Sequence, residues 1–161
     1  MPLTIGPSAW WLKTGESVNY YAKLCPVGTI LPDGSRTICK AGGCAWIVAP
    51  CSTQVNMQWA GGQYNGAVCG TRCCISEWNC LQTQLTICGF NPSDWFVPSY
   101  SQLLTFSSCS NKWDPTAGIA YWSSNECNAL NACFLVIPTP TVPCNLKSLT
   151  CNVRAFRCVT Y

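Results

Sequence analysis

The stretch Asp94–Leu104, DWFVPSYSQLL, decides the fold. Its first half is an aromatic and β-branched run typical of a strand. Pro98 ends that run, because proline lacks an N–H and disfavours helical backbone at the residue before it. Ser99 and Gln102 have the spacing of a capping box, in which the serine hydroxyl accepts the N–H of Gln102 and the glutamine side chain reaches back to the serine backbone. The stretch therefore predicts a strand that ends at Pro98 and a helix that Ser99 caps.

The composition favours a protein that works outside the cytosol or inside a packed assembly. Of the 161 residues, 48% are hydrophobic and 9% are charged, against about a quarter charged in an average soluble domain. The net charge of +3 comes from scattered Lys and Arg, so we expect no nucleic-acid partner. No apolar stretch has the length of a membrane span, so we expect no membrane insertion.

Fifteen cysteines predict a disulfide framework. Two pairs are candidates, Cys39–Cys44 across a glycine hairpin and Cys127–Cys133 around a polar loop. The number is odd, so at least one thiol has no partner within the chain. Either it is a buried free cysteine, or it links the chain covalently to another subunit.

The sequence does not point to an enzyme. It contains no histidine, which is the commonest base for serine and cysteine nucleophiles. Its carboxylates are spread singly along the chain. Zinc is a weaker alternative to disulfides at Cys69, Cys73, Cys74 and Cys80, because this cluster lacks a Cys-x-x-Cys pair. We therefore expect no metal and no other cofactor.

The chain divides into an N-terminal arm, residues 1–24, and one domain, residues 25–161. Trp10 and Trp11 in the arm either belong to a strand pair that covers the core or dock into a partner, since buried aromatics make good anchors.

Within the domain we expect mostly short antiparallel strands and long loops, with one or two short helices. Residues 72–85 have apolar side chains at helical spacing, and residues 52–72 are glycine-rich and predict a loop. Residues 152–159 alternate in polarity and predict one closing strand.

Four motifs in chain order resemble the Lcl C-terminal type of domain, which terminates collagen-like bacterial adhesins and is related to C-type-lectin-like folds. The motifs are the strand at 46–50, the stretch at 93–103, the Tyr-Trp-Ser-Ser run that begins at residue 121, and the final strand from residue 153. The residues that carry the resemblance are Asp94, Trp95, Pro98, Ser99, Gln102, Trp122, Ser123 and Arg154. Gln102 replaces the usual glutamate, and the calcium-binding tripeptides of sugar-binding C-type lectins are not apparent.

The resemblance implies an α+β, C-type-lectin-like, disulfide-rich domain. It also implies a phage virion structural protein, a tail fibre or baseplate appendage for host attachment, on the virion exterior. The partners would be other virion proteins in a homo-oligomer, taken as a trimer, and a host-surface glycan or protein receptor. The alternatives are a secreted or cell-surface bacterial adhesin that binds glycans, and a capsid decoration protein. The motif itself is expected to be scaffold, with function in the loops, the arm and the unpaired thiol.

Overall fold

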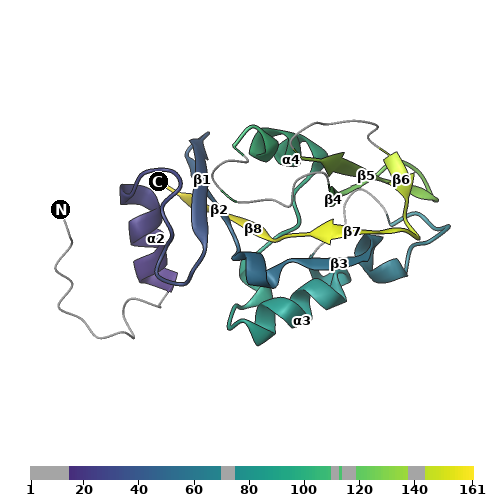
Figure 1. The fold of residues 1–161 in the computed structure, drawn as a ribbon, viewed down its shortest axis with the longest axis horizontal. Helices are drawn as coiled ribbons and strands as arrows, with labels where there is room; N and C mark the ends of the chain where they lie inside the picture. Colours follow the sequence, from purple (N-terminus) through teal and green to yellow (C-terminus); the bar gives the residue numbers. More distant parts are fainter. Residues whose placement is uncertain (1–14, 70–74, 110–112, 114–118, 138–143) are drawn as a thin grey trace.

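The computed structural model describes residues 15–69, 75–109, 113, 119–137 and 144–161, which form a mixed α+β structure (Figure 1). Three α-helices lie within this part of the chain: two in residues 25–161, as the sequence predicts, and one in the arm. The helices are α2 (Gly15–Leu24), α3 (Asn79–Ile87) and α4 (Tyr100–Ser107). The strands are β1 (Arg36–Ala41), β2 (Cys44–Val48), β3 (Val55–Gln58), β4 (Ala120–Glu126), β5 (Asn131–Val136), β6 (Cys144–Leu146), β7 (Thr150–Val153) and β8 (Phe156–Thr160). Short 3-10 turns are η1 (Cys51–Thr53), η2 (Trp59–Gly62), η3 (Ile75–Glu77) and η4 (Pro92–Asp94).

The strands form two sheets. The smaller sheet has the order β1–β2–β8, and the larger has the order β3–β7–β4–β5–β6. Neighbouring strands run antiparallel except for β4 and β7, which are parallel. Figure 1 shows β7 leading into β8, so the end of the chain connects the two sheets.

The predicted single strand over residues 152–159 is wrong, because Arg154 and Ala155 interrupt it. The Arg154 side chain turns into the interior, where its Nε donates to the Ala49 carbonyl at 2.9 Å and a terminal N–H donates to the Trp113 carbonyl at 3.1 Å. A buried guanidinium needs such acceptors. The backbone therefore leaves one sheet after Val153 and enters the other at Phe156.

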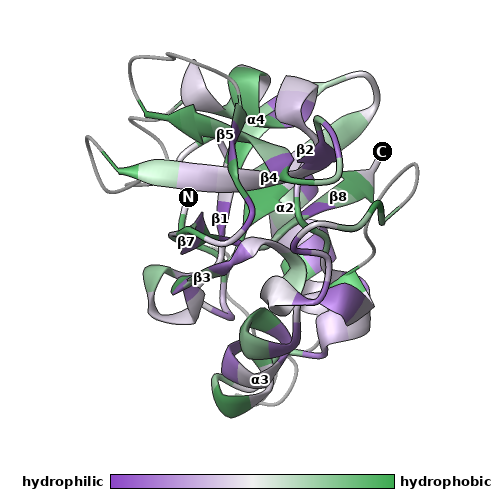
Figure 2. Cartoon of the chain, turned by 90° about the vertical axis from the view of Figure 1, so that its right-hand side faces the viewer, coloured by the Kyte–Doolittle hydropathy of each residue, from purple (hydrophilic) through white to green (hydrophobic). Residues whose placement is uncertain are grey.

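The core lies on both faces of the sheets. Successive strand residues point to opposite faces, so Tyr121 and Trp122 of β4 belong to two different clusters of buried side chains. Trp122 packs in the cluster that α3 covers, and Tyr121 packs in the cluster that α4 covers. Helix α3 contributes Leu81 and Leu85, while its remaining surface is largely polar, as the alternating colours in Figure 2 show.

Residues 15–24 form helix α2, so the predicted strand pair is wrong for this part of the arm. Val18, Tyr21 and Ala22 recur at helical spacing and are buried against β2 and β8. Trp10 and Trp11 lie outside the described residues. No described helix has both the length and the apolar character needed to cross a bilayer.

The predicted loop over residues 52–72 contains an edge strand, β3, which pairs with β7. The tight turn η2 follows it, with left-handed backbone at Ala60 (φ 48°) and Gly61 (φ 72°). The helix predicted over residues 72–85 is present as α3, but it begins at Asn79.

Candidate functional site

The corner at Pro98 has the predicted capping box. The Ser99 hydroxyl accepts the Gln102 N–H at 3.2 Å, and the Gln102 side-chain oxygen accepts the Ser99 N–H at 2.9 Å. The Tyr-Trp-Ser-Ser motif that begins at residue 121 contacts this corner, since the Ser124 N–H donates to the Pro98 carbonyl at 2.8 Å. The two stretches that carry the resemblance are therefore in contact.

The motif tryptophans Trp95 and Trp122 are buried. Trp95 is 5% exposed and Trp122 is 1% exposed, and both lie in the same core cluster. The Trp122 indole N–H donates to the Met57 carbonyl at 2.9 Å, and the Trp59 indole N–H donates to the Ser123 carbonyl at 2.8 Å. These bonds fix β4 against β3 and η2.

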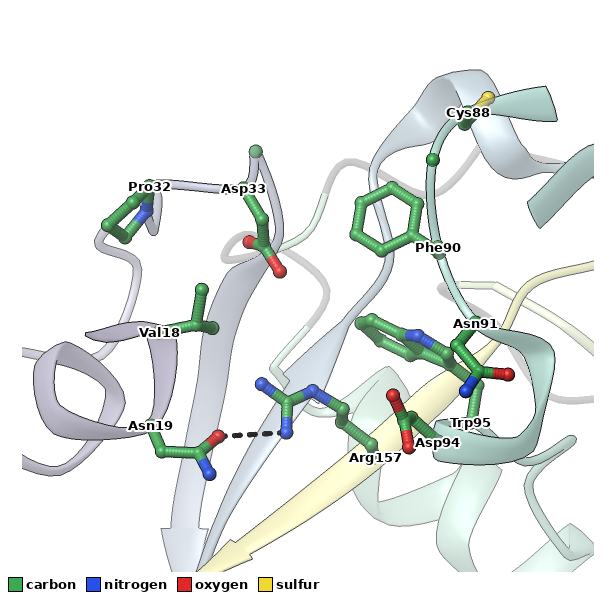
Figure 3. A pocket seen from close by; sticks show the side chains of 12 residues that line it. Val18, Asn19, Pro32, Asp33, Cys88, Phe90, Asn91, Asp94, Trp95 and Arg157 are labelled. Atoms are coloured by element: carbon green, nitrogen blue, oxygen red, sulfur yellow. Dashed lines mark hydrogen bonds between the residues drawn. The ribbon is translucent and has the colours of Figure 1, made fainter. Parts of the chain in front are cut away.

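A pocket of about 940 Å³ opens beside this corner. Helix α2 forms one wall, the turn after Leu31 forms another, and the segment between α3 and Trp95 forms the third (Figure 3). Arg157 of β8 lies between these walls. The lining residues are Val18, Asn19, Pro32, Asp33, Gly34, Cys88, Gly89, Phe90, Asn91, Asp94, Trp95 and Arg157.

Arg157 is held in place from two sides. A terminal N–H donates to Asn19 Oδ1 at 3.0 Å, and the guanidinium carbon lies 5.4 Å from the centroid of the Trp95 ring. Burial lowers the pKa of Arg157, and the negative charges of Asp33 and Asp94 oppose that shift. The guanidinium remains charged, because arginine does not lose its proton in proteins near neutral pH.

The two carboxylates come from separate turns. Asp33 lies in the Pro32–Ser35 turn, where its Oδ1 accepts the Ser35 N–H at 2.9 Å. Gly34 has φ +89°, a backbone conformation that favours glycine. Asp94 ends η4, which Asn91 caps by accepting the Ser93 N–H at 3.2 Å. Figure 3 shows the Asp94 carboxylate near the Arg157 side chain and the Asp33 carboxylate facing the guanidinium from the turn across the pocket.

The pocket combines hydrogen-bond acceptors and donors with an apolar surface. Carboxylates of Asp33 and Asp94 accept hydrogen bonds, the guanidinium of Arg157 donates them, and the amide of Asn91 does both. Phe90 and Trp95, in edge contact with ring centroids 5.5 Å apart, add an apolar surface. The positive charge of Arg157 beside the carboxylates disfavours a metal cation here.

The sequence marked Asp94 and Trp95 as fold residues but did not mark Asn19, Asp33 or Arg157 as site residues. Positions 19, 33, 94 and 157 are far apart in the chain, and only the fold brings them together. The one sequence feature that could have indicated the pocket is Asp33, an acidic residue in a turn between a proline and a glycine. The sequence predicts for Arg157 a place in the alternating final strand, which is also the last motif of the resemblance.

The predicted Cys39–Cys44 disulfide is wrong. Cys44 is bonded to Cys158 on the adjacent strand β8. The turn of the hairpin has only two residues, Gly42 and Gly43, so Ala41 lies opposite Cys44 and Cys39 lies opposite Trp46. Cys39 instead lies beside Cys109, and the two side chains are hydrogen-bonded. The pKa of Cys39 is raised, mainly by burial and secondarily by Cys109.

The predicted Cys127–Cys133 disulfide is also not the one in the structure, where Cys127 is bonded to Cys144. Cys133 lies opposite Cys144 on neighbouring strands, and its Sγ is 3.0 Å from Cys127 Sγ. The three sulfur atoms lie within 4.8 Å of one another. They could hold a soft metal only as three thiolates, and the disulfide occupies two of them.

The zinc site considered as an alternative at residues 69–80 lacks one of its four possible thiolate ligands, because Cys69 is disulfide-bonded. Cys73 and Cys74 lie outside the described residues.

An ion pair that no pattern in the sequence indicates lies beside η2. Lys147 is fully buried, and its Nζ lies 2.8 Å from Glu126 Oε2 and 2.9 Å from the Ala67 carbonyl. The ammonium also lies 4.8 Å from the centroid of the Trp59 ring. Glu126 Oε2 further accepts the Cys69 N–H at 3.0 Å. The pair therefore ties residues 59–69 to the larger sheet.

A comparison with protein-family models gives no match to this chain, and a comparison with curated proteins gives none either. Function is therefore inferred from the geometry of the chain itself.

Proposed function

We propose that this chain is a non-catalytic attachment module with a C-type-lectin-like fold, displayed on the exterior of a phage particle. Its pocket binds a saccharide of the host surface. The observation that carries the proposal is the position of Arg157, which lies over Trp95 with the carboxylates of Asp33 and Asp94 beside it.

A saccharide suits this arrangement because each hydroxyl both donates and accepts hydrogen bonds. Asp33 and Asp94 supply charged acceptors and Arg157 supplies a charged donor, and such charge-assisted bonds are stronger than neutral ones. Phe90 and Trp95 supply the apolar lining that small-molecule sites combine with a few polar groups.

Display on a particle agrees with the composition and the covalent structure. Disulfides persist in oxidising surroundings, and one of them joins Cys44 to Cys158 across 114 residues. We propose that the module is part of a tail fibre or baseplate appendage and assembles with other virion proteins. A secreted adhesin would use the same pocket, and a capsid decoration protein would differ only in its location.

Binding of host-surface polysaccharides by the purified, oxidised chain tests the proposal. Asp94→Asn keeps the size of the side chain and removes its charge, so affinity should fall about 10- to 100-fold if a charge-assisted hydrogen bond is lost. Glu77→Gln is the matched control, because Glu77 lies outside the pocket. The bound glycan should be recovered intact, as a non-catalytic module requires.

Two results would overturn the proposal. One is a chain that binds no glycan and no host cell. The other is an Asp94→Asn variant that binds as tightly as the unchanged chain. Mass spectrometry of purified virions separates the phage part of the proposal from the adhesin alternative, since only a virion protein co-purifies with the particles at fixed copy number.

A further inference from the structure

A free thiol lies against a disulfide at the outer end of the larger sheet. Cys127 and Cys144 form the disulfide, and both are exposed. The thiol of Cys133 is half-buried, with its Sγ 3.0 Å from Cys127 Sγ. The thiol is therefore already in contact with a bonded sulfur.

The backbone fixes this arrangement. Cys133 of β5 and Cys144 of β6 are directly opposite each other in an antiparallel pair, which brings their side chains together. The turn before β5 brings in Cys127, whose N–H donates to the Asn131 carbonyl at 2.9 Å. Asn128 stabilises that turn by accepting the Asn131 N–H at 2.8 Å.

We propose that Cys127, Cys133 and Cys144 form a thiol–disulfide exchange centre that releases Cys144 as the surface thiol through which the chain makes mixed disulfides. The inference does not depend on saccharide binding. It also gives one position to the covalent link that is one of the two alternatives for the odd number of cysteines.

The exchange is balanced and needs no oxidant. Cys133 gives its proton to water, and its thiolate attacks Cys127 Sγ. A Cys127–Cys133 bond forms, the Cys127–Cys144 bond breaks, and Cys144 leaves as a thiolate. This thiolate then attacks an external disulfide, either a small-molecule disulfide or one on a neighbouring protein. Cys144 becomes bonded to one half of that disulfide, and the other half leaves as a thiolate.

Cys144 is the member of the cluster suited to an external partner. Its residue is exposed, whereas Cys133 is half-buried. Burial also raises the pKa of Cys133, which keeps this thiol protonated and the exchange slow at neutral pH. In the structure the disulfide joins Cys127 to Cys144.

Peptide mapping of the complete chain tests the proposal. The chain is incubated with oxidised glutathione, the thiols are blocked with N-ethylmaleimide, and the protein is cut with pepsin at acid pH, where exchange stops. Cleavage after Leu130, Phe134 and Leu146 places the three cysteines on separate peptides. We expect both the Cys127–Cys144 and the Cys127–Cys133 linkages, with glutathione on Cys144 in the second form.

Cys133→Ser should keep the Cys127–Cys144 bond and take up no glutathione at Cys144. Cys80→Ser removes an exposed thiol elsewhere and should leave both linkages unchanged. The proposal is overturned if the unchanged chain shows only the Cys127–Cys144 linkage. It is equally overturned if glutathione attaches to Cys133 while that linkage remains. Both readouts come from the unchanged chain and do not depend on whether a variant folds.

Discussion

Arg157 lies over the indole ring of Trp95, with its guanidinium carbon 5.4 Å from the ring centroid. Trp95 belongs to the corner that decides the fold, and Arg157 is the charged centre of the pocket. The same ring therefore packs in the core on one side and orients the candidate ligand-binding group on the other. The pocket lies against the motif and is also lined by Val18 and Asn19 of the arm.

Arg157→Lys should weaken glycan binding about tenfold or more, because lysine keeps the charge but loses the planar fork that stacks on Trp95 and donates to Asn19. Titration calorimetry with the bound glycan measures the loss. Lys23→Gln is the control, since Lys23 is exposed and does not line the pocket. Equal affinities for Arg157→Lys and the unchanged chain would show that Arg157 does not contact the ligand.

Ser99→Ala should lower the free energy of unfolding by about 1 kcal/mol and leave glycan affinity unchanged. The hydroxyl satisfies the Gln102 N–H at the start of α4 and does not line the pocket. Urea denaturation without reductant measures the first effect. Thr105→Ala on the exposed face of the same helix provides a comparison, and a stability loss no larger than that variant's would argue against the cap.

Lys147→Met should destabilise the chain by about 3–5 kcal/mol, because it leaves the Glu126 carboxylate buried without its cation. Adding Glu126→Gln to Lys147→Met should restore part of that loss, since the second change removes the unpaired charge. Denaturation of the single and double variants gives the coupling energy. Simple addition of the two effects would contradict a direct ion pair.

Removal of the Cys44–Cys158 disulfide as Cys44→Ser/Cys158→Ser should cost about 2–4 kcal/mol of stability, because the bond closes a long loop in the unfolded chain. Cys127→Ser/Cys144→Ser removes a bond across only 17 residues. Loop-closure entropy makes its loss smaller by about 1–2 kcal/mol. Thermal and urea unfolding of both variants gives the comparison, and the reverse ranking would rule out the loop-length explanation.

The features that the sequence predicted correctly are local. The capping box needs only Ser99 and Gln102 on one turn of helix, and no distant residue changes that geometry. The hairpin between β1 and β2 likewise follows from its two glycines, whose φ values are 59° and 75°.

The features that the sequence missed depend on contacts between distant residues. The Cys39–Cys44 prediction is an exception, because the two-residue turn at Gly42 and Gly43 places Cys39 opposite Trp46. The partner of Cys44 comes from the last strand of the smaller sheet. Lys147 looks like a surface residue in the sequence, and it is buried only because Glu126 and the Ala67 carbonyl meet it.

The most direct test of the pocket is a nuclear magnetic resonance titration of the ¹⁵N-labelled, oxidised chain with host-surface polysaccharide. The signals of the Trp95 indole N–H and the Arg157 Nε–H should shift with a common affinity. The indole N–H signals of Trp59 and Trp122 should stay fixed, because they donate to carbonyls in the core. Shifts confined to residues outside the pocket, or no shifts for a glycan that the chain binds, would contradict the proposed site.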